Sequence, residues 1–145
     1  MIIMPKIKYY YSPSINIVRD LNKNLEYIPT PNAKQVYTHI AKNYATGTHS
    51  FNIVGSYGTG KSSFLLALEH HLNGEKEYFN PLNGSFKSVK GFEFLPIVGE
   101  ATSLLNYFAI EFGLKNKDYS ARDILEQIEA TYTEINKLGK GWLIA

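Results

Sequence analysis

Eight consecutive residues have the types and spacing needed to hold a chain of phosphates. They read Gly55-Ser56-Tyr57-Gly58-Thr59-Gly60-Lys61-Ser62. Glycines let a backbone adopt positive φ and approach anionic oxygens without a Cβ in the way. Successive backbone N–H groups then point into one concavity that suits an anion. A helix that begins at Lys61 would add the positive end of its dipole.

The spacing of these residues is the P-loop, or Walker A, pattern: Gly, four free positions, then Gly-Lys-Ser. In this pattern Lys61 neutralises charge on the β- and γ-phosphates and is the predicted catalytic residue, while the Ser62 hydroxyl is the predicted Mg²⁺ ligand. The expected cofactors are therefore ATP and Mg²⁺. The predicted nucleotide-binding residues are Gly55, Ser56, Tyr57, Gly58, Thr59, Gly60, Lys61, Ser62 and Ser63.

The elements around this loop are those that a phosphate-binding loop needs. Thr30 and Pro31 predict the start of a helix with one apolar face, which Gly47 ends. Residues 51–54 form a short apolar run that predicts a buried strand directly before the loop. A second helix is expected from Lys61 to Leu72, stopped by Asn73-Gly74.

Further along, residues 73–91 are rich in Gly and Pro and are expected to form a long, mobile connection. Residues 94–98 predict a second strand, which Pro96 would restrict to a sheet edge. Helices are expected at 101–112 and from a capping box of Ser120 and Asp123, and residues 142–145 predict a third strand. Strands alternating with helices predict an α/β fold, a three-layer P-loop NTPase sandwich with a parallel sheet. Residues 1–30 are expected to be an N-terminal arm and residues 31–145 the N-terminal part of the nucleotide-binding core.

With Gly58 as a third glycine, the loop resembles those of AAA-type ATPases, ABC ATPases and small-molecule kinases. The layout from Thr30 to Ser63 resembles AAA-type and origin-recognition-like ATPases, and the likeness covers residues 15–72. A looser likeness is to large bacterial phage-defence ATPases. The resemblance implies an ATP hydrolase, and without an Asn-Lys-x-Asp segment ATP is favoured over GTP. It also places four residues near the adenine, although packing of the arm explains them equally well: Tyr27, Ile28, Pro29 and Thr30.

One part of the ATPase pattern is absent. Such enzymes hold Mg²⁺ with an acid that follows four apolar residues, whereas the run 142–145 ends at Ala145. The run 95–98 is followed by Gly99, so Glu100 is not interpreted as the Mg²⁺ acid. The sheet would also lack the strand that separates the loop strand from the acid-bearing strand. The sequence is therefore expected to be an N-terminal fragment of a larger ATPase, or to be completed by a partner chain.

Two other functions remain open. A small-molecule or nucleoside kinase could use Glu100 or Asp118 toward an acceptor, but its arginine-rich lid is missing from residues 73–91. A non-catalytic nucleotide-sensing module is the second alternative. Arg19 and Arg122 are interpreted as surface residues rather than as fingers reaching a neighbouring subunit.

Composition narrows the remaining classes of function and of binding partner. The net charge is +2, no basic run suggests nucleic acid, and no apolar run reaches the about 18 residues of a membrane span. With no cysteine, disulfides and Cys-based metal sites are impossible. A cytoplasmic protein is expected, with a nucleotide and either a second copy or another protein as partners. The four histidines are expected to be polar surface residues without a metal, and Tyr9-Tyr10-Tyr11 is expected to be packing.

Overall fold

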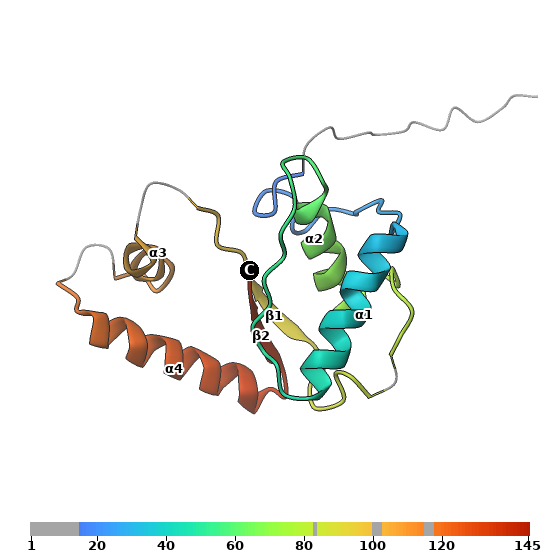
Figure 1. Ribbon diagram of the computed structural model, residues 1–145. Coiled ribbons are helices and arrows are strands. Elements are labelled where there is room, and N and C mark those ends of the chain that lie inside the picture. The colour runs from blue at the N-terminus through green and yellow to red at the C-terminus, as the bar shows by residue number, and fades with distance from the viewer. Residues whose placement is uncertain (1–14, 83, 100–102, 115–117) are drawn as a thin grey trace, which may run out of the picture.

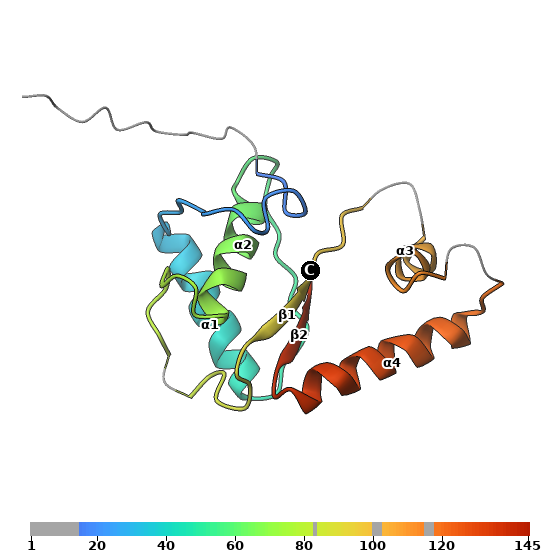
Figure 2. The ribbon, with the colours of Figure 1, turned by 180° about the vertical axis from the view of Figure 1, so that it is seen from behind.

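The computed structural model describes residues 15–82, 84–99, 103–114 and 118–145. Within these ranges two parallel strands lie between two pairs of helices (Figure 1). Seen from behind, the same arrangement holds, with α1 and α2 on one side of the strands and α3 and α4 on the other (Figure 2). The elements are α1 (Pro31–Ala45), α2 (Lys61–Leu72), β1 (Phe92–Leu95), α3 (Leu104–Glu111), α4 (Ala121–Lys137) and β2 (Gly141–Ile144).

The two strands pair in parallel, with Phe92 opposite Gly141 and Leu95 opposite Ile144. The predicted strand 142–145 is confirmed to within one residue. The predicted strand 94–98 is wrong in its bounds, because β1 lies two to three residues earlier and Pro96 follows its end. Pro96 has no N–H to donate to a ladder. Pairing resumes beyond it, where the Ile97 N–H donates to the Ala145 carbonyl at 2.5 Å.

Side chains along β1 point alternately to the two faces of the strand pair, and each face has its own part of the core. Phe94 packs toward a cluster that joins α1, α2 and residues 15–27, whereas Leu95 belongs to a second cluster with α3 and α4. Successive strand side chains point to opposite faces. The four-residue strand β1 therefore ties both pairs of helices to one sheet. This is a mixed α/β arrangement with helices on both sides of the strands.

The predicted strand at 51–54 does not form among the described residues. Phe51 and Ile53 are half-buried against the α1–α2 cluster, but Asn52 is exposed and the Val54 side chain is 86% exposed. A strand needs a hydrogen-bonded neighbour, and β1 pairs only with β2 in the described sheet. The segment runs along the β1–β2 pair in both views without joining its ladder (Figures 1 and 2).

Both helices that flank the loop follow the sequence prediction. The Thr30 side chain accepts a hydrogen bond from the Ala33 N–H at 3.2 Å, and Pro31 is the first residue of α1. Ala33, Tyr37, Ile40 and Ala41 make the buried face of this helix. Helix α2 is buried on more than one side, since Leu66, Ala67 and Leu68 are all at most 3% exposed. None of the described helices has the length and apolar composition to span a membrane.

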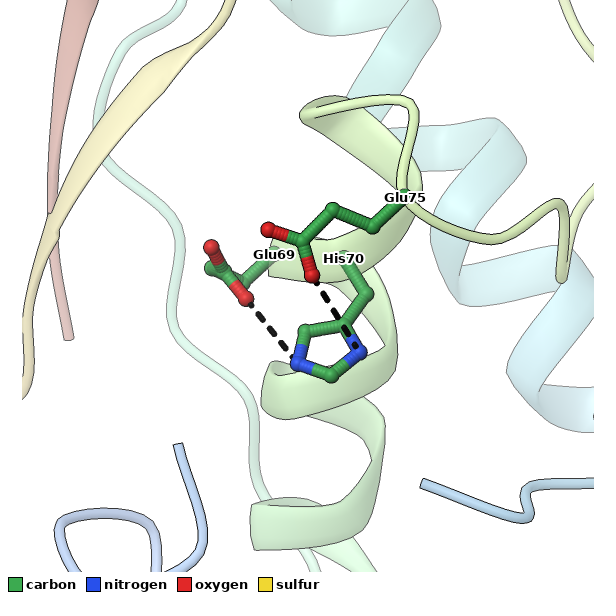
Figure 3. A group of neighbouring side chains, drawn as sticks. All are labelled: Glu69, His70 and Glu75. Atoms are coloured by element: carbon green, nitrogen blue, oxygen red, sulfur yellow. Dashed lines mark ion pairs between the residues drawn. The ribbon is translucent and has the colours of Figure 1, made fainter. Parts of the chain in front are cut away.

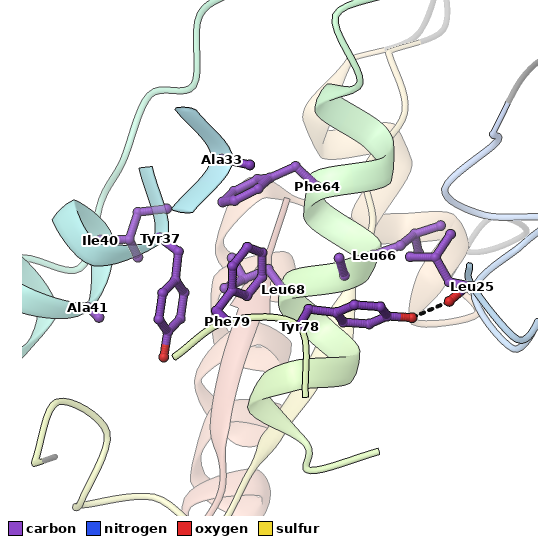
Figure 4. Close-up of a cluster of buried hydrophobic side chains, with 11 residues drawn as sticks. Leu25, Ala33, Tyr37, Ile40, Ala41, Phe64, Leu66, Leu68, Tyr78 and Phe79 are labelled. Atoms are coloured by element: carbon purple, nitrogen blue, oxygen red, sulfur yellow. Dashed lines mark hydrogen bonds between the residues drawn. The ribbon is translucent and has the colours of Figure 1, made fainter. Parts of the chain in front are cut away.

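The connection between α2 and β1, which its glycines and prolines predict to be mobile, contains two buried aromatic residues. Tyr78 and Phe79 are 8% and 2% exposed and belong to the same core cluster; Phe79 lies between α1 and α2, and Tyr78 points toward Leu25 (Figure 4). The Phe79 ring stacks on Tyr37 at a centroid distance of 4.6 Å. The Tyr78 hydroxyl donates to the Leu25 carbonyl, which ties the described part of the arm to this connection. Two aromatic side chains therefore anchor the segment.

The described part of the N-terminal arm, residues 15–30, contains a turn held by Asp20. The Asp20 carboxylate accepts from the Asn16 N–H at 2.9 Å and pairs with Arg19 and Lys23 at 2.6 and 2.7 Å. Hydrogen bonds from Arg19 and Lys23 stabilise its charged form and hold the pKa of Asp20 well below its usual range. Ile15, Ile17 and Leu21 pack on the α1–α2 core beside this turn. The Tyr9-Tyr10-Tyr11 segment lies outside the described residues.

The predicted capping box at the start of α4 is confirmed. The Ser120 hydroxyl accepts from the Asp123 N–H, and the Asp123 carboxylate accepts from the Ser120 N–H at 2.7 Å. Ile124 and Ile135 are the buried residues of this helix, and its C-cap residue Leu138 is 64% exposed. The start of the predicted helix 101–112 falls partly outside the described residues, and α3 ends close to its predicted end.

Replacing Ser120 by alanine is expected to lower the free energy of unfolding by about 1 kcal/mol at pH 7, because the cap of α4 is lost. Urea denaturation would measure it, with the exposed Ser88→Ala as matched control. Hydrogen bonds from the Ser120 N–H and hydroxyl lower the pKa of Asp123. Their contribution to the free energy of unfolding is present above the usual aspartate pKa and is lost as the pH falls through the lowered pKa of Asp123. The difference in stability between Ser120→Ala and the wild type should therefore shrink in acid. Equal stability of both variants at pH 7 would contradict the capping role.

Candidate functional site

The predicted nucleotide-binding residues lie together in one exposed loop and the first turn of α2. Gly58 and Gly60 have φ of +79° and +82°, a conformation that favours glycine. The Tyr57 side chain is fully exposed at the tip of the loop. Gly55 is required for another reason, because a Cβ there would lie 2.8 Å from Thr59 Oγ1, which donates to the Ser56 carbonyl. Three glycines are therefore each explained by local geometry.

The Lys61 side chain folds back over the loop. Its Nζ donates to the carbonyl oxygens of Gly55 and Ser56, each at 2.7 Å. Both partners are neutral and exposed, so a phosphate oxygen could replace them with stronger, charge-assisted hydrogen bonds. Among the described residues, the Lys61 ammonium group therefore lies over the loop without an ion pair to a carboxylate.

The N-terminus of α2 is open. Its N-cap is Gly60, which has no side chain to accept from the first turn. In the described part of the chain, the N–H groups of Lys61, Ser62 and Ser63 have no acceptor, and the first paired amide is that of Phe64, bonded to the Gly60 carbonyl. Unpaired amides at a helix N-terminus bind anions. The hydroxyls of Ser62 and Ser63 lie in the same turn, in position to contact a phosphate or its metal ion if these were bound to the unpaired amides.

Two of the four residues suggested to lie near adenine take part in packing or helix capping. The Tyr27 ring packs edge-on against Tyr78 at 5.7 Å between centroids, and Thr30 caps α1. Ile28, by contrast, is 89% exposed between them. Of the four, only Ile28 offers a large apolar side chain that the core does not use.

Among the described residues, both candidate arginines are paired with carboxylates that are not part of the loop. Glu100 lies outside the described residues, and Asp118 is exposed ahead of α4. Arg122 pairs with Glu126 at 3.0 Å on the exposed side of α4, and Arg19 pairs with Asp20. The arrangement at the loop therefore supplies phosphate-binding groups, while the acid for Mg²⁺ is not identified among the described residues.

His39 and His49 are exposed as expected, but the two histidines at the end of α2 are buried or half-buried, so for them the expectation is wrong. His70 is 6% exposed, and its Nε2 lies 3.1 Å from the Leu21 carbonyl. His71 is half-buried, with Nδ1 accepting from the Tyr78 N–H and Nε2 lying 3.2 Å from the Tyr37 hydroxyl. Burial lowers the pKa of His71. Neither position could be recognised from helical spacing, because α2 is covered on several sides by segments distant in the sequence.

No protein-family model, curated protein or solved structure matches this chain. The functional assignment consequently depends on the chemistry of the loop and the residues around it.

Proposed function

We propose that the chain binds ATP with Mg²⁺ in the loop 55–60 and the first turn of α2, and that hydrolysis is coupled to a conformational change in an assembly. The observation that carries the proposal is the position of Lys61. Within the described ranges its ammonium group is bonded to loop carbonyls alone, and the backbone amides of residues 61–63 have no acceptor. A cation and a set of unpaired amides in one short segment favour a polyanion.

Each group has a role in this proposal. The amides of the loop and of residues 61–63 hold the phosphate oxygens, and Lys61 moves from the carbonyls of Gly55 and Ser56 to the β- and γ-phosphates. Ser62 provides a hydroxyl to Mg²⁺. In hydrolysis, Lys61 would stabilise the negative charge that develops in the transition state. When bound, Mg²⁺ would supply a counter-charge to the phosphates, with Ser62 as the residue that would help to hold it.

Calorimetric titration of the folded chain tests the proposal. Mg-ATP is expected to bind saturably at one site, and adenosine is expected to give no measurable binding, because the loop contacts phosphates and not the base. Comparing ATP with GTP tests the preference inferred from the sequence. Absence of saturable ATP binding by a sample with intact circular dichroism would refute the proposal. Binding without any phosphate release would support a nucleotide-sensing role in place of hydrolysis.

A further inference from the structure

The imidazole of His71 lies where α2 meets the connection that follows it. The ring is half-buried and packs edge-on against two aromatic rings, Tyr37 at 5.1 Å and Phe79 at 5.3 Å between centroids. Its Nε2 lies 3.2 Å from the Tyr37 hydroxyl, and its Nδ1 lies 3.3 Å from the Tyr78 backbone nitrogen. One side chain of α2 therefore contacts both α1 and the connection 73–91.

These two contacts fix the tautomer of the neutral ring. A backbone N–H can only donate, so Nδ1 must carry the lone pair that accepts from Tyr78. The hydrogen of the neutral ring is then on Nε2, which donates to the oxygen of the Tyr37 hydroxyl. Burial raises the pKa of Tyr37, and a hydrogen bond with the Leu82 backbone opposes that rise. The Tyr37 oxygen is thus in contact with His71 and with a second backbone group of the connection.

We propose that His71 is a pH-sensitive anchor, which holds the connection 73–91 on the α1–α2 core when the ring is neutral and loosens it when the ring is protonated. Protonation adds a hydrogen to Nδ1, and this hydrogen would face the Tyr78 N–H across the present distance of 3.3 Å. Two donors cannot share that space, so either the amide or the ring must move. The N–H of Tyr78, a buried residue, then loses its acceptor, which costs free energy.

The surroundings of His71 favour the neutral ring and also offer a partner to the protonated one. Burial lowers the pKa of His71, whereas the charge of Glu77 and a hydrogen bond with the Lys76 backbone act in the opposite direction. Among the described residues, the titratable groups that face the ring are Tyr37 from α1 and Glu77 and Tyr78 from the connection. The Lys76 backbone is therefore the group that a protonated Nδ1 can bond in place of Tyr78.

His70, the neighbouring residue of α2, has different surroundings. Its Nε2 lies 3.1 Å from the Leu21 carbonyl and 3.4 Å from Glu69 Oε2, and its Nδ1 lies 3.9 Å from Glu75 Oε2 (Figure 3). All three of these partners are acceptors, so a hydrogen on each nitrogen of His70 would meet no donor. Protonation of His70 is therefore compatible with the folded structure, whereas protonation of His71 sets two donors against each other.

The pH range of the anchor follows from the direction of the pKa shift. Because the pKa of His71 is lower in the folded chain than in the unfolded chain, its contribution to the free energy of unfolding is fully present above the usual histidine value. The contribution is lost as the pH falls from that value through the lowered one. The pKa values of Asp20 and Asp123 are lowered from the usual aspartate value, so these carboxylates change stability little above about pH 5.

NMR and amide hydrogen exchange of the full chain, without nucleotide, test this anchor. At about pH 7.5, above the usual histidine pKa, the nitrogen shifts of His71 should show a hydrogen on Nε2 and none on Nδ1. Between about pH 7.5 and about pH 5, the protection factor of the Tyr78 amide should fall about tenfold, as expected for loss of one hydrogen bond. His71→Gln should remove this fall, because a glutamine amide can accept from Tyr78 and donate to Tyr37 without titrating. His39→Gln is the matched control, since His39 is an exposed histidine of α1, and it should show the same fall as the wild type.

Two results on the wild type would overturn the proposal, whether or not His71→Gln folds. One is a hydrogen on Nδ1 of the neutral His71 ring, and the other is equal protection of the Tyr78 amide at both pH values. With the circular dichroism of both variants intact, a fall of the same size in His71→Gln and His39→Gln would also overturn it. None of these measurements involves nucleotide, so their outcome is separate from that of the proposed nucleotide site.

Discussion

Replacing Lys61 by alanine is expected to weaken Mg-ATP binding by about 100-fold. The lysine would make two charge-assisted hydrogen bonds to phosphate oxygens, at about 1.5 kcal/mol or more each, and about 3 kcal/mol corresponds to this factor. The present partners of its ammonium group are two exposed loop carbonyls, so removal of the side chain should not disturb the core. Calorimetric titration of wild type and variant gives the two dissociation constants.

The matched control for this experiment is Lys34→Ala. Lys34 is an exposed lysine on α1, distant in sequence from the loop, and its substitution removes the same charge. The affinity of this variant for Mg-ATP should match that of the wild type within a factor of about two, because general attraction of a dianionic ligand to one exposed lysine is weak at physiological salt. Equal affinities of Lys61→Ala and the wild type would exclude the phosphate-binding role of Lys61.

Replacing Phe79 by alanine is expected to lower the free energy of unfolding by about 3–5 kcal/mol, the range for a buried phenylalanine. Phe79 is 2% exposed, and its ring contacts Tyr37 of α1 and both Phe64 and His71 of α2. Figure 4 shows the ring between the two helices. Its loss would leave a cavity where three segments meet. Urea denaturation followed by circular dichroism measures the change.

Tyr132→Ala serves as the control for Phe79→Ala. Tyr132 is an aromatic residue of α4 with 53% of its surface exposed, so its removal should change stability by no more than about 0.5 kcal/mol. A loss of less than about 1 kcal/mol for Phe79→Ala would mean that the connection 73–91 is not anchored in the core. The segment would then be as mobile as its glycines and prolines suggested.

Local signals in the sequence were sufficient for the helices and for the geometry of the loop. Thr30 with Pro31 and Ser120 with Asp123 predicted two helix starts, because caps act within a single turn of the chain. Gly58 and Gly60 predicted the positive φ of the loop for the same reason. The proposed nucleotide site is contained in one short segment, and its residues could therefore be named before any tertiary contact was known.

Contacts between distant segments decided what the sequence could not. The run 51–54 has the composition of a strand, yet strand formation requires a hydrogen-bonded neighbour, which the described sheet does not give it. Tyr78 and Phe79 anchor a connection whose composition suggested mobility, because α1 and the arm supply the surfaces they bury. Glu75 meets Glu69 and His70 only because the chain reverses at Gly74. The sequence by itself determined features that arise within one turn of backbone, and the tertiary structure determined burial and proximity, which depend on residues far apart in the chain.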